Sequence, residues 1–199
     1  MPDAGTHSEV IGKLIHKWCG KPFEEFYYSK NGEKVKIKNR IKRDEIHKYL
    51  PQVLEYFRIF DPSQEDGKRS KKITPQKYWD FAVENKKDLD IFSCVIDSWN
   101  YMHHDTTGFS REDKWLESVL SYRNDLAELN NIHFHTVIHP KTQKKDRDGK
   151  IVMPGIHDLK GGSEWGNNGK TIIVVHRDFS SETTDVKIVK AKPKIVGRH

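Results

Sequence analysis

Two apolar segments in the middle of the sequence each end in a side chain that could do chemistry. Residues 91–97, IFSCVID, end in Asp97, and residues 132–139, IHFHTVIH, end in His139. If both segments are strands of one parallel sheet, their carboxyl ends meet at the edge where functional groups of open sheets gather. A carboxylate there can hold Mg²⁺ through water, and a neighbouring imidazole can donate a hydrogen bond to a phosphate. The alternative is that Asp97 only caps the following turn.

A glycine-rich segment, DLKGGSEWGNNGK at residues 158–170, is the second candidate. Adjacent glycines allow a close backbone approach, and hydroxyl, amide and lysine side chains can contact phosphates. The pattern predicts a loop that binds the backbone of a nucleic acid. Its predicted contacts are Lys160, Gly161, Gly162, Ser163, Asn167 and Asn168. An ordinary Gly/Asn turn is the alternative.

Alternating lysines near the end of the chain, Lys190, Lys192 and Lys194, would share one face of a strand. Such a row can neutralise phosphates, but it is also typical of a solvated edge that prevents aggregation.

Histidine pairs suggest a different chemistry. His133 and His135 would share a strand face, and His103 and His104 follow Asp97. Such pairs can ligate Zn²⁺, although no cysteine or HExxH spacing supports a zinc site here. A His/Asp metallohydrolase is therefore kept as an alternative.

Composition limits the class of protein. The chain has 199 residues, a formal net charge of +6 and a sequence pI of about 9.1, which favours polyanionic partners. No apolar run approaches the roughly 18 residues of a membrane span, and the N-terminus lacks the apolar region of a signal peptide. Cys19 and Cys94 are expected to be reduced thiols. We therefore expect a cytoplasmic protein with no membrane partner.

The periodicity of apolar residues predicts the elements that position these groups. Helices are expected over residues 8–18, 44–57, 74–87 and 110–130, with Pro51 kinking or splitting the second. Strands are expected over 56–61, 91–97, 132–139, 171–178 and 185–196. A basic insertion at about residues 27–43 contains a possible hairpin at Asn31–Gly32. This order predicts an α/β fold with a mostly parallel sheet flanked by helices and antiparallel C-terminal strands.

Taken together, these segments resemble the RecA-fold motor domain of hexameric replicative DNA helicases, the DnaB and Twinkle-like family. VIDSWNYM is similar to the Walker B strand, with Ser98 in place of the usual Pro, and HTVIHPKT is similar to the next motif. The resemblance implies that Asp97 is the Mg²⁺-linked carboxylate and that His139 senses the γ-phosphate of ATP.

The later motifs extend the resemblance. IHDLKGGSEWGNNGKTIIVVHRD resembles the family's DNA-loop motif, which implies single-stranded DNA binding by residues 160–168, although Lys170 stands where the family usually has Asp. VKAKPKIVG resembles a stretch that reaches the nucleotide of a neighbouring subunit. Lys190 matches its Lys, and Lys192 stands where the Arg finger is usual. The resemblance covers residues 1–199 as one partial RecA-like ATPase domain, except the basic insertion.

One motif of the family is missing. The sequence contains no GxxxxGK[ST] P-loop, and its start resembles the region just downstream of that unit. Pro2–Asp3 resembles the Pro-Glu of the catalytic base, which makes Asp3 a candidate catalytic residue. We therefore expect part of a motor that is inactive alone and whose complete form uses ATP and Mg²⁺. Its partners would be single-stranded DNA and either a homo-oligomeric ring or a P-loop-bearing complement. A non-enzymatic DNA-binding or ring-assembly subunit is the alternative.

Overall fold

The computed structural model describes residues 7–29, 31–60, 73–141, 144–178 and 183–192. The chain divides into two compact units, Met1–Lys71 and Lys72–His199, and each is described by itself. Whether residues 1–199 function as a single domain stays a prediction.

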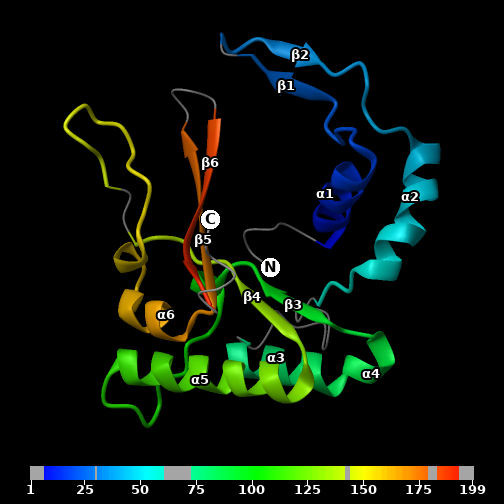
Figure 1. Ribbon diagram of the computed structural model, residues 1–199. Helices are drawn as coiled ribbons and strands as arrows, with labels where there is room; N and C mark the ends of the chain where they lie inside the picture. Colours follow the sequence, from blue (N-terminus) through cyan, green and yellow to red (C-terminus); the bar gives the residue numbers. More distant parts are fainter. Residues whose placement is uncertain (1–6, 30, 61–72, 142–143, 179–182, 193–199) are drawn as a thin grey trace. The chain divides into compact units, whose positions relative to one another are not determined.

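The first unit pairs two helices and carries a small hairpin. It contains α1 (His7–Cys19), β1 (Phe26–Tyr28), β2 (Lys34–Lys36) and α2 (Arg43–Tyr56). Ile15, Ile41 and Val53 form its buried centre. The predicted hairpin is confirmed, with Gly32 at a φ of +78° in its turn. The first unit is drawn from blue to cyan in Figure 1.

Two predictions for the first unit are corrected. Helix α2 continues through Pro51, so the predicted split is wrong, whereas the alternative, a kink, stays a prediction. The strand predicted over residues 56–61 is wrong, because Tyr56 ends α2 and residues 57–60 form no strand. The N–H of Phe57 donates to the carbonyl of Val53 at 2.9 Å, so helical hydrogen bonding reaches into the segment that its apolar residues marked as a strand.

The second unit holds most of the regular structure. Its helices are α3 (Pro75–Glu84), α4 (Lys86–Leu89), η2 (Trp99–Tyr101), α5 (Glu112–Asn130), η3 (Ile156–Asp158) and α6 (Gly162–Asn168). Its strands are β3 (Ser93–Ile96), β4 (His133–Thr136), β5 (Thr171–Asp178) and β6 (Thr183–Ala191). Thr74 caps α3 by accepting a hydrogen bond from the N–H of Lys77 at 3.4 Å, and Pro75 takes the first helical position.

The described strands form three two-stranded sheets. β3 and β4 are parallel, whereas β1–β2 and β5–β6 are antiparallel. The mixed α/β class is therefore confirmed, as are the parallel pair in the middle of the chain and the antiparallel pair that follows it. The larger RecA-like sheet stays a prediction.

Tryptophan rings dominate the core of the second unit. Trp99 lies among Trp79, Trp115 and Trp165, with ring centroids 6.2, 6.1 and 5.0 Å away. Cys94 and Ile96 face this cluster from β3, where burial raises the pKa of the Cys94 thiol to about 11. Helices α3 and α5 cover this side of the β3–β4 pair (Figure 1). Among the described helices, none is long and apolar enough to cross a membrane.

Candidate functional site

The carboxyl ends of β3 and β4 form the candidate site. The two strands pair in register from Ser93 with His133 to Ile96 with Thr136, and Asp97 follows β3 directly. The pairing continues past the strands, because the N–H of Val137 donates to Ile96 at 2.9 Å. The predicted pair of neighbouring parallel strands is thus confirmed, but β4 ends at Thr136, so His139 lies three residues past its end rather than at it. The chemical roles of Asp97 and His139 stay predictions.

Asn100 joins the two chain segments after the strands. The main-chain N–H of His139 donates to Oδ1 of Asn100 at 2.8 Å, and Nδ2 of Asn100 donates to the carbonyl of His139 at 3.4 Å. The N–H of Trp99 also donates to the carbonyl of Val137 at 2.8 Å. These bonds fix the backbone that carries the imidazole against the turn that carries the carboxylate. Asn100 follows Asp97 by three residues, a spacing that could have marked it as a site residue.

Aromatic packing on the core side fixes the turn after β3. Trp99 is 5% exposed, and Ser98 beside it is also buried. The His104 ring lies 5.1 Å from Trp99 and 4.9 Å from Trp115, and Nε2 of His104 is 3.2 Å from the carbonyl of Trp99. Burial lowers the pKa of His104, so this imidazole is neutral near neutral pH. The packing gives the turn a rigid base.

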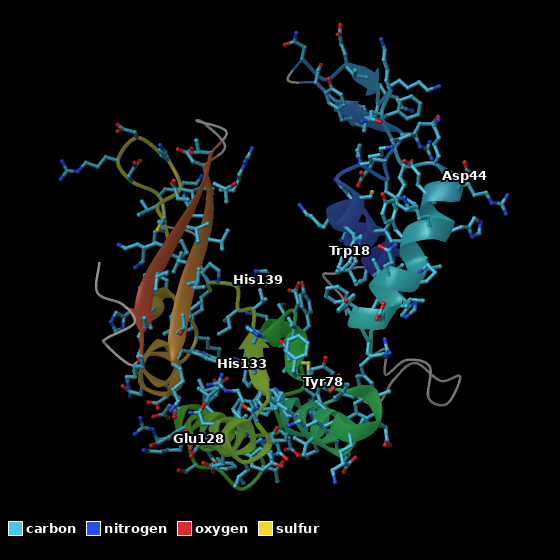
Figure 2. All side chains as sticks on the ribbon, turned by 45° about the vertical axis from the view of Figure 1, so that its right-hand side comes forward. Trp18, Asp44, Tyr78, Glu128, His133 and His139 are labelled. Atoms are coloured by element: carbon cyan, nitrogen blue, oxygen red, sulfur yellow. The ribbon has the colours of Figure 1, made fainter. Side chains whose placement is uncertain are left out.

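The outer side of the β3–β4 pair is open. Side chains alternate along β3, so Asp97 continues the side of Val95, which is exposed, whereas Ile96 faces the core. Asp97 is half-buried, and His139 is exposed. Figure 2 shows His139 beyond the end of β4, with His133 near its start. A substrate can therefore reach both groups from the same edge.

The donor set at this edge suits a hard cation better than a soft one. Asp97 supplies a half-buried carboxylate, and oxygen ligands are those that Mg²⁺ prefers. The Cys94 thiol faces the core and is kept protonated by its raised pKa. Magnesium commonly uses one or two carboxylates together with water and substrate phosphates, so the residues fit this ion.

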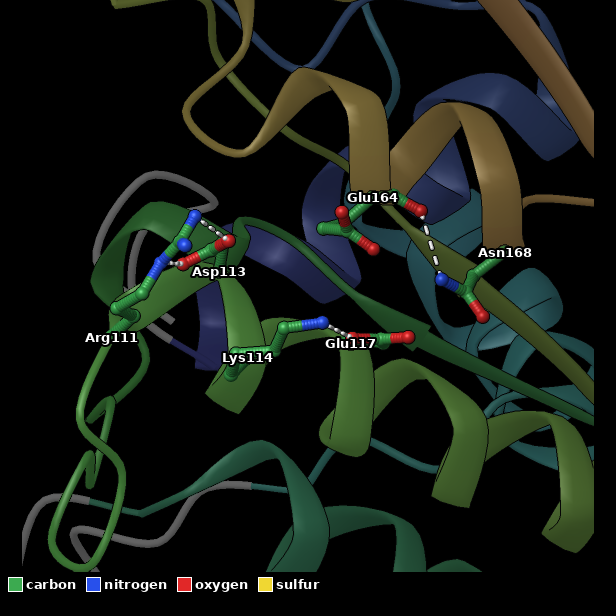
Figure 3. Close-up of polar contacts among 6 residues, drawn as sticks. All are labelled: Arg111, Asp113, Lys114, Glu117, Glu164 and Asn168. Carbon is green, nitrogen blue, oxygen red and sulfur yellow. Dashed lines mark hydrogen bonds and ion pairs between the residues drawn. The ribbon is translucent and has the colours of Figure 1, made fainter.

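The glycine-rich segment is not the predicted loop. Residues 162–168 form α6, which lies over the first turns of α5, where Arg111 pairs with Asp113 and Lys114 with Glu117 (Figure 3). Trp165 is 4% exposed, and its Nε1–H donates to the carbonyl of Lys160 at 3.1 Å. Burial of this ring within the Trp cluster orders the segment as a helix.

The paired glycines have a packing reason in this fold. Gly161 has a φ of +71°, and a Cβ there would lie 2.3 Å from Cδ2 of Leu116 on α5. A Cβ on Gly162 would lie 2.3 Å from the carbonyl oxygen of Ile156. Both positions therefore require glycine whether or not the segment contacts DNA.

Polar groups of the same segment are partly engaged inside the second unit. Lys160 pairs with Glu112, and Nζ of Lys170 is 3.4 Å from Oε1 of Glu128. Ser163 and Asn167 are exposed. The carbonyl of Asn168 accepts from Arg123 at 3.3 Å. Binding of DNA by this segment stays a prediction, and it would use a helix surface.

Arg123 was not predicted as a functional or structural residue. Its side chain is 8% exposed on α5, and desolvation lowers its pKa. Together with Nδ2 of Asn124, 3.2 Å from the same carbonyl, it holds the end of α6. A buried arginine in the middle of an amphipathic helix gives no signal of its partner in the sequence.

Lys190, in β6, and Lys192, one residue past its end, have different environments. Nζ of Lys190 donates to the carbonyl of Gly166 and lies 3.4 Å from that of Asn167, so it binds the end of α6. Desolvation and the neighbouring charge of Lys192 lower the pKa of Lys190. Lys192 is exposed, and its main-chain N–H donates to Lys170 at 2.9 Å. Lys192 is thus the more accessible of the pair.

The remaining candidates are placed as follows. Asp3 and Lys194 lie outside the described residues. The rings of His133 and His135 stack with centroids 6.2 Å apart. Within the described part of the chain, no group of three or more His, Cys, Asp or Glu side chains is arranged to hold a metal ion.

Comparison with known proteins gives a distant relative. The chain is 24% identical over 195 residues to the Twinkle homolog protein, chloroplastic/mitochondrial, of Arabidopsis thaliana. The match covers 94% of this chain and 25% of that protein, so the chain spans a quarter of the relative's length. No family model matches the chain. The match supports, weakly, a relation to the Twinkle-like helicases. Because the relative is named for chloroplasts and mitochondria, it does not bear out the expected cytoplasmic location.

Proposed function

We propose that this chain is part of the motor of an ATP-dependent replicative DNA helicase, in which ATP hydrolysis is coupled to movement along single-stranded DNA. The observation that carries the proposal is the geometry of the β3–β4 edge. Asp97 and His139 follow adjacent parallel strands, and Asn100, three residues after Asp97, hydrogen-bonds to the main chain of His139. The similarity to a Twinkle homologue over nearly the whole chain supports the same assignment.

In this proposal the edge of the sheet faces the nucleotide. Asp97 would hold Mg²⁺ through its water shell, and His139 would donate a hydrogen bond to the γ-phosphate. Mg²⁺, when bound, would neutralise part of the charge on the phosphates. The rigid turn over Trp99 keeps the carboxylate in place, which matters because phosphoryl transfer depends on positioning and electrostatics.

The phosphate-binding loop must come from elsewhere. Without backbone amides and a P-loop Lys to cradle the β- and γ-phosphates, the chain alone should bind ATP poorly. A P-loop-bearing polypeptide would complete the site, whereas a ring made only of this chain would still lack the loop. Lys192, and Lys190 once released from α6, would reach a neighbour's nucleotide, and the exposed side of residues 160–168 would contact DNA.

A chimera tests the proposal. The aligned stretch of the Arabidopsis Twinkle homologue is replaced by this chain, and ATPase activity is measured with and without single-stranded DNA. We expect the isolated chain to be inactive and the chimera to hydrolyse ATP. Asp97→Asn should lower the rate of the chimera about 100-fold or more, since an electrostatic group in phosphoryl transfer is lost. An active chimera with an unchanged rate after Asp97→Asn would contradict the assignment.

The absence of a P-loop motif favours a second candidate, a non-enzymatic DNA-binding or ring-assembly subunit. In that case the chain would bind single-stranded DNA with a strong salt dependence. The chimera would assemble and bind DNA, yet it would not hydrolyse ATP.

A further inference from the structure

The basic insertion at residues 27–43 has no counterpart in the helicase resemblance and no part in the proposed motor. It contains five Lys and two Arg against one Glu, and it follows two acidic residues, Glu24 and Glu25. In the structure it is built around the β1–β2 hairpin. The N–H of Gly32 donates to Ser29 at 2.9 Å, and the N–H of Ile37 donates to Glu25 at 2.9 Å. The hairpin is thus a defined element, which Figure 1 shows extending beyond the α1–α2 pair of its own unit.

The register of the hairpin places rings and charges on one face. Phe26 pairs with Lys36 and Tyr28 pairs with Lys34. Directly opposed residues of an antiparallel pair point to the same side, so these four side chains form one surface, here named the hairpin face. Nζ of Lys34 lies 4.0 Å from the centre of the Phe26 ring, a cation–π contact that confirms the shared side.

The hairpin face is accessible, and its charge is only partly balanced. Tyr28 is 72% exposed, and both strand lysines are exposed. Glu25 lies 4.0 Å from Lys36 and 3.6 Å from Arg40, so one carboxylate is shared by two cations. The neighbouring Lys38 adds a further exposed positive charge.

We propose that the hairpin face binds single-stranded nucleic acid. Proteins bind single strands by combining cations that follow the phosphates with aromatic rings on which bases stack. Phe26 and Tyr28 are two residues apart on β1, about 6.8 Å at the usual rise of a strand. Lys34 and Lys36 lie beside the rings on the same face. One strand can therefore place its bases on the rings and its phosphates at the lysines.

The arrangement fits a nucleic acid better than a lipid surface. Peptides that lie on membranes separate an apolar side from a charged side. Here the rings and the lysines share a side, while Tyr27 and Val35 occupy the opposite one. Because bases and phosphates alternate along a nucleic acid, a mixed surface matches that pattern.

The test uses the full chain and a fluorescent dT oligonucleotide of about 20 nucleotides, longer than the site of one small binding module. Lys34→Gln/Lys36→Gln should weaken binding about tenfold. It should also reduce the slope of log K against log salt by about 1.4, because each phosphate contact on a single strand contributes about 0.7. The matched control, Lys13→Gln/Lys17→Gln on α1, should leave the affinity within about twofold and the slope unchanged.

Substitution of the ring separates stacking from charge. Tyr28→Ala should weaken binding by about fivefold or more, whereas Tyr28→Phe should stay within about twofold because it keeps the stacking surface. Circular dichroism should show the same helix content for all variants, since Tyr28 is exposed. Equal affinity of Tyr28→Ala and the unchanged chain would overturn the proposal. Binding to phosphatidylserine vesicles without binding to the oligonucleotide would also overturn it.

The proposal stands apart from the motor assignment, because the hairpin belongs to the first unit. Lys160→Gln/Lys170→Gln removes charge from the predicted DNA segment of the second unit. If only this variant loses binding, the hairpin proposal fails and the motor assignment stands. If only the hairpin variants lose binding, the hairpin proposal stands and the predicted role of residues 160–168 fails.

Discussion

The carboxamide of Asn100 holds the main chain of His139 through two hydrogen bonds, one from the His139 N–H at 2.8 Å and one to its carbonyl at 3.4 Å. The Asn100 side chain thus extends the hydrogen bonding between the two chain segments beyond the ends of β3 and β4. Because the imidazole is carried by this backbone, its position depends on an amide that hydrogen-bonds to the main chain of His139.

We expect Asn100→Ala to lower the free energy of unfolding of the second unit by about 1–2 kcal/mol, because two hydrogen bonds are lost at an exposed position. Urea unfolding followed by tryptophan fluorescence measures this, since Trp79, Trp99, Trp115 and Trp165 report on this unit. Asn167→Ala, an exposed amide of the same unit, should change the value by less than about 0.5 kcal/mol. Equal effects of the two substitutions would show that the hydrogen bonds between Asn100 and His139 contribute nothing to stability.

Substituting alanine for the two glycines of α6, Gly162 and Gly166, should change the free energy of unfolding in opposite directions. Gly162→Ala should destabilise the second unit by about 1–3 kcal/mol, because the new Cβ meets a backbone carbonyl that cannot move aside easily. Gly166→Ala is the matched control in the same helix. Its Cβ would lie 3.5 Å from Cγ2 of Ile156, an ordinary contact. This substitution should stabilise the unit by about 0.5–1 kcal/mol through helix propensity. Thermal unfolding of both variants checks the difference in sign.

Part of this structure follows from sequence pattern, and part does not. Asp97 and His139 could be placed together because short apolar runs predict strands and parallel strands expose their carboxyl ends at one edge. Helix α6 could not be predicted, because its glycines and asparagines are typical of loops. Its fold depends on the burial of Trp165 and on a close approach to Leu116, which are contacts distant in sequence.

Contacts that local sequence pattern does not reveal also explain the wrong strand at residues 56–61 and the missed role of Arg123. Residues 56–61 have the composition of a strand, yet hydrogen bonding from α2 carries through Phe57. The pairing of Arg123 with the end of α6 depends on two segments 45 residues apart. Local pattern carries no information about such a partner.

His104 gives a prediction for pH dependence. Burial lowers its pKa in the folded state from the ordinary value of 6.5. Between the lowered pKa and 6.5, the unfolded chain therefore binds more protons than the folded chain at this residue, so stability must fall as the pH drops through that window. The charged or titratable groups around it are His103, Glu112 and Lys160.

Urea unfolding at a series of pH values below 7 measures this effect. His104→Phe keeps a ring between Trp99 and Trp115 but cannot titrate, so the dependence of its unfolding free energy on pH should be flatter. His7→Phe, an exposed histidine of the first unit, is the control and should keep the original slope. An unchanged slope for His104→Phe would assign the pH dependence to other groups.

Substitutions of Lys190, in β6, and of Lys192, just past its end, should have different effects on stability and on activity. The Lys190 ammonium binds carbonyls at the end of α6, so Lys190→Ala should lower the free energy of unfolding of the second unit by about 1 kcal/mol. Lys192→Ala, at an exposed side chain, should leave stability within about 0.5 kcal/mol. In the active chimera, however, Lys192→Ala should lower ATP turnover. The physical reason is that a cation from a neighbouring subunit stabilises the charge of the transferring phosphoryl group.

Lys192→Arg then tests the type of contact. A planar, bidentate guanidinium is the better partner for a phosphate, so turnover with Arg should equal or exceed that with Lys. Urea unfolding and steady-state ATPase rates on the same preparations give both readouts. If the Ala, Arg and Lys forms at position 192 hydrolyse ATP at the same rate, Lys192 does not act on the nucleotide of a neighbouring subunit. The exposed lysine would then serve only to keep the edge of β6 solvated and free of other strands.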